Sequence, residues 1–569
     1  MYSTLLEIKD LSVDFISNNK ATSALHNINI TVNRGEIVAV VGESGSGKSV
    51  TSLSVLQLVP SPPAVYKSGT IILNTDGPEI NILQLSKKEL NTVRGNKAAM
   101  IFQEPMTSLN PVLTCGSQVM EAILLHEHLS KEEAKAKTIS LFEKVKLPDP
   151  AGMFYRFPHQ LSGGQKQRVM IAMAISCEPD LLICDEPTTA LDVTVQKNIL
   201  LLIKELQQQN NMGVIFITHD LGVVAEIADR VTVLYKGKIV EENTTKQLFA
   251  NPQHPYTKAL LACRPILHKK GERLPIVSDF LEPENVKLPI ADNRLPVPDK
   301  NETRSKNAIL ISVENMKVYY PAKKTFLGKI TAYNKAVDDV SFEVYEGETL
   351  GLVGESGCGK STLGRTLLRL INATSGRVIY KGTDLLQADE KTIKGLRKDM
   401  QIIFQDPYSS LNPRITIGEA IAEPLLVHGL ISSSKGRKER VIELLEKVSL
   451  GSEHYNRYPH EFSGGQRQRI VIARALALQP SFIICDESVS ALDVSVQAQV
   501  LNLLNDLKKE FGFTSIFISH DLSVVRYISD RIMVMSKGKI EELGEAEQVY
   551  NNPASGYTKK LIASIPKGF

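Results

Sequence analysis

The chain has 569 residues, of which 43% are hydrophobic and 23% charged, and its formal net charge is +3. This length exceeds what one hydrophobic core supports, and the composition is that of a soluble globular protein. The near-neutral charge argues against a nucleic-acid-binding surface, which needs a concentrated basic face. No apolar run approaches the ~20 residues that span a bilayer, and the first residues lack the features of a signal peptide.

The first elements along the chain predict a nucleotide-binding fold. Residues 5–15 alternate in polarity as a half-buried strand does, and residues 35–41 form a short apolar strand. That strand runs directly into Gly42-Glu-Ser-Gly-Ser-Gly-Lys-Ser49, which is a P-loop pattern in its required position. Its glycines let backbone amides close around phosphate oxygens, and the following helix points its positive end at them. Lys48 is expected to neutralise the β- and γ-phosphates, and Ser49 to bind Mg²⁺.

The rest of the first half carries helical and acidic stretches. Ser130 and Glu133 have the spacing of a capping box, which predicts a helix start there. Ser162-Gly-Gly-Gln165 precedes a helical run, and paired glycines with a serine at a helix N-terminus form an anion site. Residues 182–184 form an apolar strand that ends in Asp185 and Glu186, and two buried acids are costly unless they face a metal ion or a phosphate. We expect Asp185 to hold Mg²⁺ and Glu186 to orient or deprotonate the attacking water, with structural loop-capping carboxylates as the alternative.

The whole pattern is repeated in the second half, which indicates duplication of a domain. The signature, the acidic pair and a later histidine are each 301 residues apart in the two copies, although a lone histidine is more often structural. The predicted site residues of the first half are Gly42, Gly45, Gly47, Lys48, Ser49, Gln103, Ser162, Gly163, Gly164, Gln165, Asp185, Glu186 and His219. Those of the second half are Gly354, Gly357, Gly359, Lys360, Ser361, Gln405, Ser463, Gly464, Gly465, Gln466, Asp486, Glu487 and His520.

The two copies are separated by a stretch that is polar and broken by prolines. We therefore divide the chain into a first domain at 1–265, a linker at 266–307 and a second domain at 308–569. As a flexible coil of about 40 residues the linker would average roughly 35 Å end to end. This length would let the surfaces of the two domains determine how they pack. The six cysteines are scattered without a C-x-x-C pair, which favours reduced thiols over disulfides or zinc.

This order of motifs, present twice, resembles that of the ATP-binding cassette (ABC) ATPases over nearly the whole chain except the linker. The resemblance implies an α/β fold of two tandem P-loop domains, each with a RecA-like core, an antiparallel β subdomain and a helical signature subdomain. In that family two cassettes pack head to tail, and each ATP lies between the P-loop of one and the signature of the other. One implied site combines Lys48, Ser49, Gln103, Asp185, Glu186 and His219 with Ser463 and Gly465. The other combines Lys360, Ser361, Gln405, Asp486, Glu487 and His520 with Ser162 and Gly164.

The same resemblance implies roles for further residues. His219 and His520 are expected to contact the γ-phosphate of ATP. The oxygen ligands expected around Mg²⁺ are Ser49, Gln103, Asp185, Ser361, Gln405 and Asp486. Phe15 and Tyr320 are candidates to stack on adenine, although both also fit a plain core role.

Several stretches resemble one group of ABC proteins, the oligopeptide, dipeptide and nickel importer ATPases. They are residues 105–111, 251–261, 407–413 and 552–561. Fusion of two ATPases in one chain is most similar to the microcin C-type peptide importers, with the glutathione importer ATPase as the close alternative. Some relatives hold an iron–sulfur cluster beyond the first signature, but only Cys263 lies there in this chain, so no cluster is expected.

The resemblance also implies partners and a location. It predicts an enzyme that hydrolyses ATP to ADP and phosphate, bound peripherally to the cytoplasmic side of the inner membrane. Two transmembrane permease subunits and an extracytoplasmic solute-binding protein are the expected partners, without nucleic acid. Residues 104–125 and 406–427 are expected to form the grooves that receive the cytoplasmic helices of the permeases.

Two questions remain open at this point. Asp486-Glu-Ser-Val489 replaces the usual Asp-Glu-Pro-Thr, which could loosen this turn, yet both sites are expected to hydrolyse ATP because the catalytic-type residues remain. From another functional class, a soluble tandem ABC protein acting on ribosomes is the alternative. Its long charged helical linker differs from the proline-broken linker here.

Overall fold

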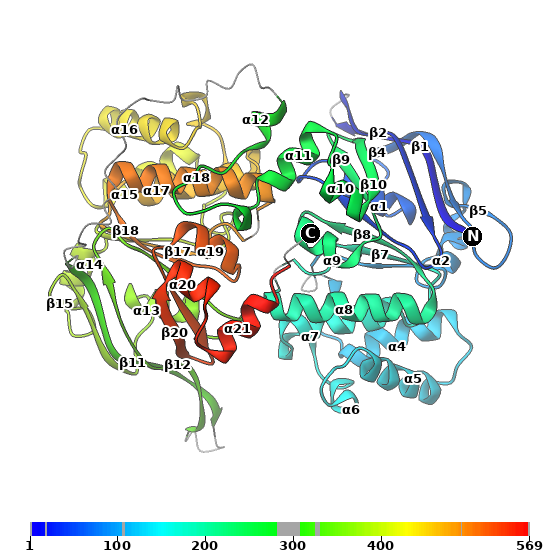
Figure 1. The fold of residues 1–569 in the computed structure, drawn as a ribbon, viewed down its shortest axis with the longest axis horizontal. Coiled ribbons are helices and arrows are strands. Elements are labelled where there is room, and N and C mark those ends of the chain that lie inside the picture. The colour runs from blue at the N-terminus through cyan, green and yellow to red at the C-terminus, as the bar shows by residue number, and fades with distance from the viewer. Residues whose placement is uncertain are drawn as a thin grey trace. The chain divides into compact units, whose positions relative to one another are not determined.

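The computed structural model describes residues 3–17, 20–104, 108–189, 191–281, 308–324, 330–490 and 492–566. The chain divides into two compact units, the first comprising Met1–Leu261 and Pro566–Phe569 and the second Ala262–Ile565. In the described residues, each unit contains a six-stranded core sheet, a four-stranded sheet and a set of helices (Figure 1). The predicted fold class, two tandem α/β domains, is confirmed.

The core sheet of the first unit has the strand order β10-β9-β3-β8-β7-β6. Its strands are β3 (Ile37–Val41), β6 (Ala98–Ile101), β7 (Leu181–Asp185), β8 (Gly213–Thr218), β9 (Arg230–Tyr235) and β10 (Lys238–Thr244). All neighbours are parallel except β9 and β10. Every residue of β3, β7 and β8 is buried, as expected for parallel strands that are covered on both faces. The P-loop strand and the acidic strand thus end at the same edge of the sheet, separated by β8.

A second, antiparallel sheet has the order β2-β1-β4-β5. Its strands are β1 (Thr4–Ser17), β2 (Lys20–Asn33), β4 (Ala64–Leu73) and β5 (Ile80–Asn81). The long strands β1 and β2 pair with register shifts, for example between Ile8 and Leu11. Buried apolar residues of this sheet share one hydrophobic cluster with β3 and β7, so the two sheets pack against each other.

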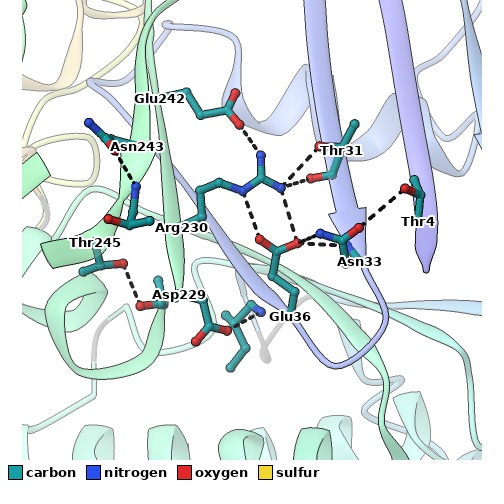
Figure 2. A network of polar contacts seen from close by, with 12 residues as sticks. Thr4, Thr31, Asn33, Glu36, Asp229, Arg230, Glu242, Asn243 and Thr245 are labelled. Atoms are coloured by element: carbon teal, nitrogen blue, oxygen red, sulfur yellow. Dashed lines mark hydrogen bonds and ion pairs between the residues drawn. The ribbon is translucent and has the colours of Figure 1, made fainter. Parts of the chain in front are cut away.

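Arg230, the first residue of β9, ties the two sheets of the first unit together (Figure 2). Its Nε donates to Glu36 Oε1 at 2.9 Å and its Nη2 donates to Thr31 Oγ1 at 3.3 Å. Glu36 Oε2 also accepts a hydrogen bond from the main-chain N–H of Asn33 at 2.9 Å. Since Thr31, Asn33 and Glu36 lie around the connection from β2 to β3, one guanidinium fixes where the P-loop strand begins.

Most helices of the first unit follow a residue whose side chain accepts a hydrogen bond from a free N–H group of the first turn. Ser130 and Glu133 form the predicted capping box, with Glu133 N–H donating to Ser130 Oγ at 3.3 Å. Helices α4, α5 and α7 contact one another, and α4 to α7 are grouped in the cyan part of the unit in Figure 1. The helices are α1 (Lys48–Val55), α2 (Lys87–Val93), α4 (Cys115–His126), α5 (Lys131–Lys144), α6 (Pro150–Met153), α7 (Gly163–Ala174), α8 (Val193–Asn210), α9 (Leu221–Ile227), α10 (Thr245–Ala250) and α11 (Pro255–Ala262).

The second unit repeats both sheets, with strand orders β16-β17-β18-β13-β19-β20 and β12-β11-β14-β15. Arg531 and Glu348 repeat the ion pair of Arg230 and Glu36, with Nη1 and Oε1 3.2 Å apart. The strands are β11 (Ile309–Lys324), β12 (Ile330–Tyr345), β13 (Thr349–Val353), β14 (Ser375–Tyr380), β15 (Thr383–Asp384), β16 (Met400–Ile403), β17 (Phe482–Asp486), β18 (Thr514–Ile518), β19 (Arg531–Ser536) and β20 (Lys539–Glu545).

The helices of the second unit include one that precedes its first strand. They are α12 (Val277–Leu281), α13 (Lys360–Leu367), α14 (Glu390–Leu396), α15 (Ile417–Val427), α16 (Ser434–Lys447), α17 (Gly464–Leu476), α18 (Val494–Phe511), α19 (Leu522–Ile528), α20 (Ala546–Asn551) and α21 (Gly556–Ala563). Residues 266–281 of the predicted linker therefore belong to the second unit, and residues 282–307 lie outside the described residues. Among the helices described in both units, none combines the length and hydrophobicity that crossing a membrane requires.

A buried lysine gives the second unit a specific pH dependence. Burial lowers the pKa of Lys508, on α18, to about 8; the charge of Lys270 adds to this, and Asp530 and Glu348 partly oppose it. The unfolded chain holds this proton up to about pH 10.4. Between about pH 8 and 10.4 the unfolded state therefore binds one more proton than the folded state, and this group makes the folded state more stable as pH rises.

Replacing Lys508 by Gln, the residue at the matching position 207, should remove this rise. We expect the free energy of unfolding of the wild type to rise relative to that of the variant between about pH 8 and 10.4. The rise should be at most about 1.4 kcal/mol per pH unit. Urea unfolding of the full chain at several pH values measures the difference. Parallel curves for the two proteins would show that Lys508 titrates normally.

Candidate active sites

Each P-loop connects the carboxyl end of a buried core strand to a helix. The residues before the lysines, Gly47 and Gly359, have φ angles of 106° and 108°. A Cβ on Gly359 would lie 2.0 Å from the carbonyl oxygen of Ala336, so a side chain does not fit there. The Nζ atoms of Lys48 and Lys360 each donate to two main-chain carbonyls of their own loop at 2.7 to 2.9 Å. Both ammonium groups are therefore fixed across the loop that is expected to bind phosphate.

The carboxylate that ends each acidic strand faces the serine of the P-loop. Ser49 Oγ donates to Asp185 Oδ1 at 3.5 Å, and Ser361 Oγ donates to Asp486 Oδ1 at 2.7 Å. Asp185 is only 6% exposed, and burial together with the charge of Glu186 raises its pKa to about 6. A buried carboxylate beside a hydroxyl supplies the oxygen ligands that Mg²⁺ prefers. These residues fit the ion.

Three side chains converge on Glu186, the next residue. Gln103 Nε2 donates to Glu186 Oε2 at 3.1 Å, Thr189 Oγ1 donates to the same oxygen at 3.0 Å, and His219 Nδ1 lies 3.3 Å from Oε1. Burial opposes ionisation of Glu186, but the hydrogen bond and charge of His219 outweigh it and hold the pKa below its ordinary value. Its φ of 46° is a left-handed conformation that is costly without glycine and is common at functional sites. Glu186 is thus an ionised, oriented carboxylate suited to accept a proton from water.

Glu487 of the second unit is held by a smaller set of contacts. Its φ is 50°, Gln405 Nε2 donates to Oε2 at 2.7 Å, and His520 Nδ1 lies 3.7 Å from the same oxygen. Ser490 stands where the first unit has Thr189, but its Oγ donates to the main-chain oxygen of Glu487 at 2.9 Å. The carboxylate of Glu487 thus lacks the hydroxyl contact that Thr189 makes with Glu186.

The turn that follows the acidic pair keeps its shape despite the sequence change at Ser488 and Val489. The N–H of Thr189 donates to the main-chain oxygen of Glu186 at 3.3 Å, and the N–H of Ser490 donates to that of Glu487 at the same distance. Loss of the proline therefore leaves the turn hydrogen bond in place.

A second difference between the units lies beside the carboxylates that are expected to bind Mg²⁺. Arg365 Nη2 is 3.5 Å from Asp486 Oδ2. The matching position in α1 holds Leu53, which carries no charge. The two sites therefore differ in charge next to the expected Mg²⁺ ligand, a difference that was missed because the P-loop pattern ends before these positions.

The signature residues lie at the starts of α7 and α17. Ser162 and Ser463 cap these helices, and each Oγ accepts a hydrogen bond from the N–H of the signature glutamine, Gln165 or Gln466, at 3.3 Å. A Cβ on Gly465 would lie 2.3 Å from Val496 Cγ1 in the first turn of α18. A Cβ on Gly164 would likewise lie 2.6 Å from Val195 Cγ1 in α8. Each signature helix is thus packed closely on the helix that follows the acidic strand of its own unit.

The candidate adenine-stacking residues occupy different environments. Phe15 is half-buried on β1 and packs against the core, whereas Tyr320 on β11 is 40% exposed. Stacking on adenine by these residues stays a prediction, as does the pairing of each P-loop with the signature of the other unit.

The C-terminal motif of each unit contacts its P-loop, a role that the sequence did not reveal. Tyr256 of the 251–261 motif is fully buried on α11, and its hydroxyl accepts a hydrogen bond from the N–H of Glu43 at 2.9 Å. Tyr557 accepts one from Glu355 at 3.3 Å, and burial raises the pKa of Tyr557 to about 12, so this hydroxyl is neutral. The only available signal was a tyrosine at the same place in both motifs.

Replacing Tyr256 by Phe should weaken nucleotide binding at the first P-loop. The variant keeps the ring but removes the acceptor for the Glu43 N–H, so we expect the Kd for ATP to rise roughly 3- to 10-fold at that site. Titration with a fluorescent ATP analogue measures this, with the exposed Tyr155→Phe as the matched control. An unchanged affinity would show that the contact does not support the loop.

Comparison with protein-family models and with known proteins agrees with this geometry. The ABC transporter model matches residues 25–189 and 337–490, and the model "Oligopeptide/dipeptide transporter, C-terminal region" matches 240–284 and 542–568. The glutathione import ATP-binding protein GsiA of Pectobacterium atrosepticum is 48% identical over 564 residues, covering 99% of this chain and 89% of the relative. Its counterpart in Escherichia coli (strain K12) is 49% identical over 568 residues, with the same coverage.

A solved structure of a dimeric ATP-binding cassette with ADP and phosphate in a post-hydrolysis state is also similar. It is 29% identical, covers 42% of this chain and 98% of its own, and has a TM-score of 0.38. The curated relatives carry the name of the glutathione importer, which was the alternative to the microcin C-type importer in the sequence analysis. The family matches cover both units and both C-terminal motifs. The chain therefore belongs to the ABC transporter family, as a tandem ATP-hydrolysing subunit of its oligopeptide/dipeptide importer group.

Proposed function

We propose that this protein drives import of a peptide-like solute by hydrolysing two ATP molecules, each enclosed between the P-loop of one unit and the signature of the other. The observation that carries the proposal is the convergence of a glutamine and a histidine on an ionised glutamate beside each P-loop. Both units contain this arrangement. ATP would hold the units together, and its hydrolysis would release them, which converts phosphate chemistry into motion.

Within each site the residues divide the work. Lys48 and Lys360 neutralise the phosphates, and Glu186 and Glu487 take the proton of the attacking water. The Mg²⁺ ligands would be Ser49, Gln103 and Asp185 in one site and Ser361, Gln405 and Asp486 in the other. The ion would supply positive charge against the β- and γ-phosphate oxygens. His219 and His520, which lie beside the glutamates, would contact the γ-phosphate.

Glutathione is the first cargo to test, because the curated relatives are named as glutathione importers. Other peptides, microcin C-like peptides and nickel are the alternatives. Cells that lack their own importers and carry this protein with its permeases and binding protein should accumulate labelled glutathione. Uptake of a different solute would reassign the cargo, whereas co-purification with ribosomes instead of membranes would reject the transporter function.

The partners would be two transmembrane permeases on the cytoplasmic face of the inner membrane, supplied by an extracytoplasmic binding protein. A pocket of about 390 Å³ in the second unit supports this, because α15, α17 and β16 line it together with Ser410 of the segment after Gln405. Its lining combines apolar residues such as Leu370, Phe404 and Val427 with the ion pair of Arg474 and Glu423. Val427 is 74% exposed, so an apolar side chain is accessible to a partner at this pocket.

The first unit offers a related surface. Val112 is 75% exposed and Leu125 is 73% exposed, and both lie in the segment 104–125 predicted to receive a permease helix. Residues 105–107 of that segment lie outside the described residues. We expect each groove to take one cytoplasmic helix.

Replacing Val427 by Asp should weaken docking of the permease, because an apolar helix would then cover a charge. We expect the ATPase rate of the isolated chain to stay unchanged while its stimulation by reconstituted permeases falls at least about tenfold. Leu201→Asp, at another exposed apolar residue, on α8, serves as the control. Equal loss in both variants would place the docking surface elsewhere.

A further inference from the structure

The segment that follows the first unit is packed into the second unit. The boundary between the units lies between Leu261 and Ala262, and residues 262–281, here termed the strap, belong to the second unit. The strap contains a 3₁₀ helix, η3 (Pro265–Leu267), which contacts α19. Cys263 and Leu274 of the strap are fully buried.

Asn502 on α18 binds the main chain of the strap. Its Oδ1 accepts a hydrogen bond from the N–H of Leu274 at 2.9 Å, and its Nδ2 donates to the carbonyl oxygen of Leu274 at 2.8 Å. Asn502 is 8% exposed, so these groups have little access to water. Because an unpaired buried amide is costly, the strap and Asn502 stabilise each other.

Two further contacts flank this pair. Tyr527 on α19 donates its hydroxyl hydrogen to the carbonyl oxygen of Glu272 at 2.6 Å, and Lys270 Nζ lies 2.6 Å from Asp530 Oδ1. Asp530 also accepts a hydrogen bond from the N–H of Thr349 at 2.8 Å, at the start of the P-loop strand β13. The strap therefore contacts the helix that follows Asp493, the helix that follows His520, and the aspartate that supports β13.

The matching surface of the first unit has different chemistry. Leu201, 51% exposed, stands where the second unit has Asn502, and Glu226 stands where it has Tyr527. A leucine cannot pair with main-chain N–H and C=O groups, and an ionised carboxylate cannot donate to a carbonyl. The surface that receives the strap is thus particular to the second unit.

We propose that the strap is a built-in tether, by which the second cassette captures the chain that leaves the first. The strap continues directly from α11, the last helix of the first unit, so a docked strap reduces the covalent connection between the cassettes to the end of this helix. The cassettes then stay attached when no nucleotide bridges them. This attachment does not depend on residues 282–307.

Cutting the chain beyond the strap tests the tether directly. A protease recognition sequence is inserted between Pro289 and Pro298 of the full chain, the protein is cut, and the dissociation constant of the two fragments is measured without nucleotide. The wild-type fragments should remain associated. Asn502→Leu, which installs the residue of the first unit, should raise the dissociation constant roughly 10- to 100-fold.

Two variants keep the test interpretable. Leu201→Asn, at the matching position of the first unit, should leave the association unchanged. If Asn502→Leu fails to fold, Lys270→Ala removes the ion pair from the strap side and should raise the dissociation constant by a smaller factor. Separation of the wild-type fragments as soon as they are cut would overturn the tether, and so would equal association of the wild type and all strap variants. Neither result depends on what the transporter carries.

Discussion

Replacing Glu186 by Gln is expected to silence the first ATP site, and replacing Glu487 by Gln is expected to silence the second. Gln has the shape of Glu but cannot accept the proton of the attacking water, and loss of a general base costs roughly 10²- to 10⁴-fold in rate. Each single variant should lose at least about half of the total turnover, and the double variant should lose about 100-fold or more. Phosphate release from the full chain under steady-state conditions measures this.

The affinity for ATP provides the control, because neither substitution removes a residue expected to bind phosphate. All three variants should bind ATP as the wild type does. The loss should be larger for Glu186, whose carboxylate is held by Thr189 in addition to a glutamine and a histidine. A single variant with unchanged turnover would show that its site is inactive in the wild type.

Combining Lys48→Ala with Ser463→Ala should cost little more activity than Lys48→Ala alone. Both residues are proposed to serve the same ATP, so once Lys48 is lost the signature serine has no γ-phosphate left to stabilise. Combining Lys48→Ala with Ser162→Ala disables both sites, and turnover should fall a further 10²-fold or so, as removal of one charge-stabilising donor does. Steady-state ATPase rates of the single and double variants decide between these outcomes.

The two serines make a matched pair for this comparison. Each caps a helix and accepts a hydrogen bond from its signature glutamine at 3.3 Å, so either alanine removes the same cap and costs similar stability. If instead Lys48→Ala combined with Ser162→Ala cost little more activity than Lys48→Ala alone, each P-loop would work with the signature of its own unit.

The sequence predicted the parts of each site that local patterns define. The strand predicted at 35–41 with the helix after it, and the acidic strand ending at Asp185, are confirmed as β3 with α1 and as β7. Such strands are predictable because a short apolar run that ends in charged residues fits a buried parallel strand better than most other elements. The capping box of Ser130 and Glu133 was also predictable, because a capping box is recognised from two residue types three positions apart.

The contacts that were missed join residues far apart in the chain. Tyr256 reaches Glu43, and Leu274 pairs with Asn502, over 213 and 228 residues respectively. The strap is broken by Pro265 and Pro275, so it has no hydrophobic period that predicts packing. Its place depends on Asn502 and Tyr527, whose roles appear only when α18 and α19 lie beside it.

The central claim is that each ATP is shared between a P-loop of one cassette and a signature of the other. The most direct measurement is an experimental structure of the Glu186→Gln, Glu487→Gln protein with Mg²⁺ and ATP trapped in both sites. The account predicts Ser463 Oγ within hydrogen-bonding distance, about 3 Å, of the γ-phosphate bound at Lys48, and Ser162 Oγ equally close to the one at Lys360. Signature serines that lie far from any γ-phosphate, with both sites filled, would contradict it.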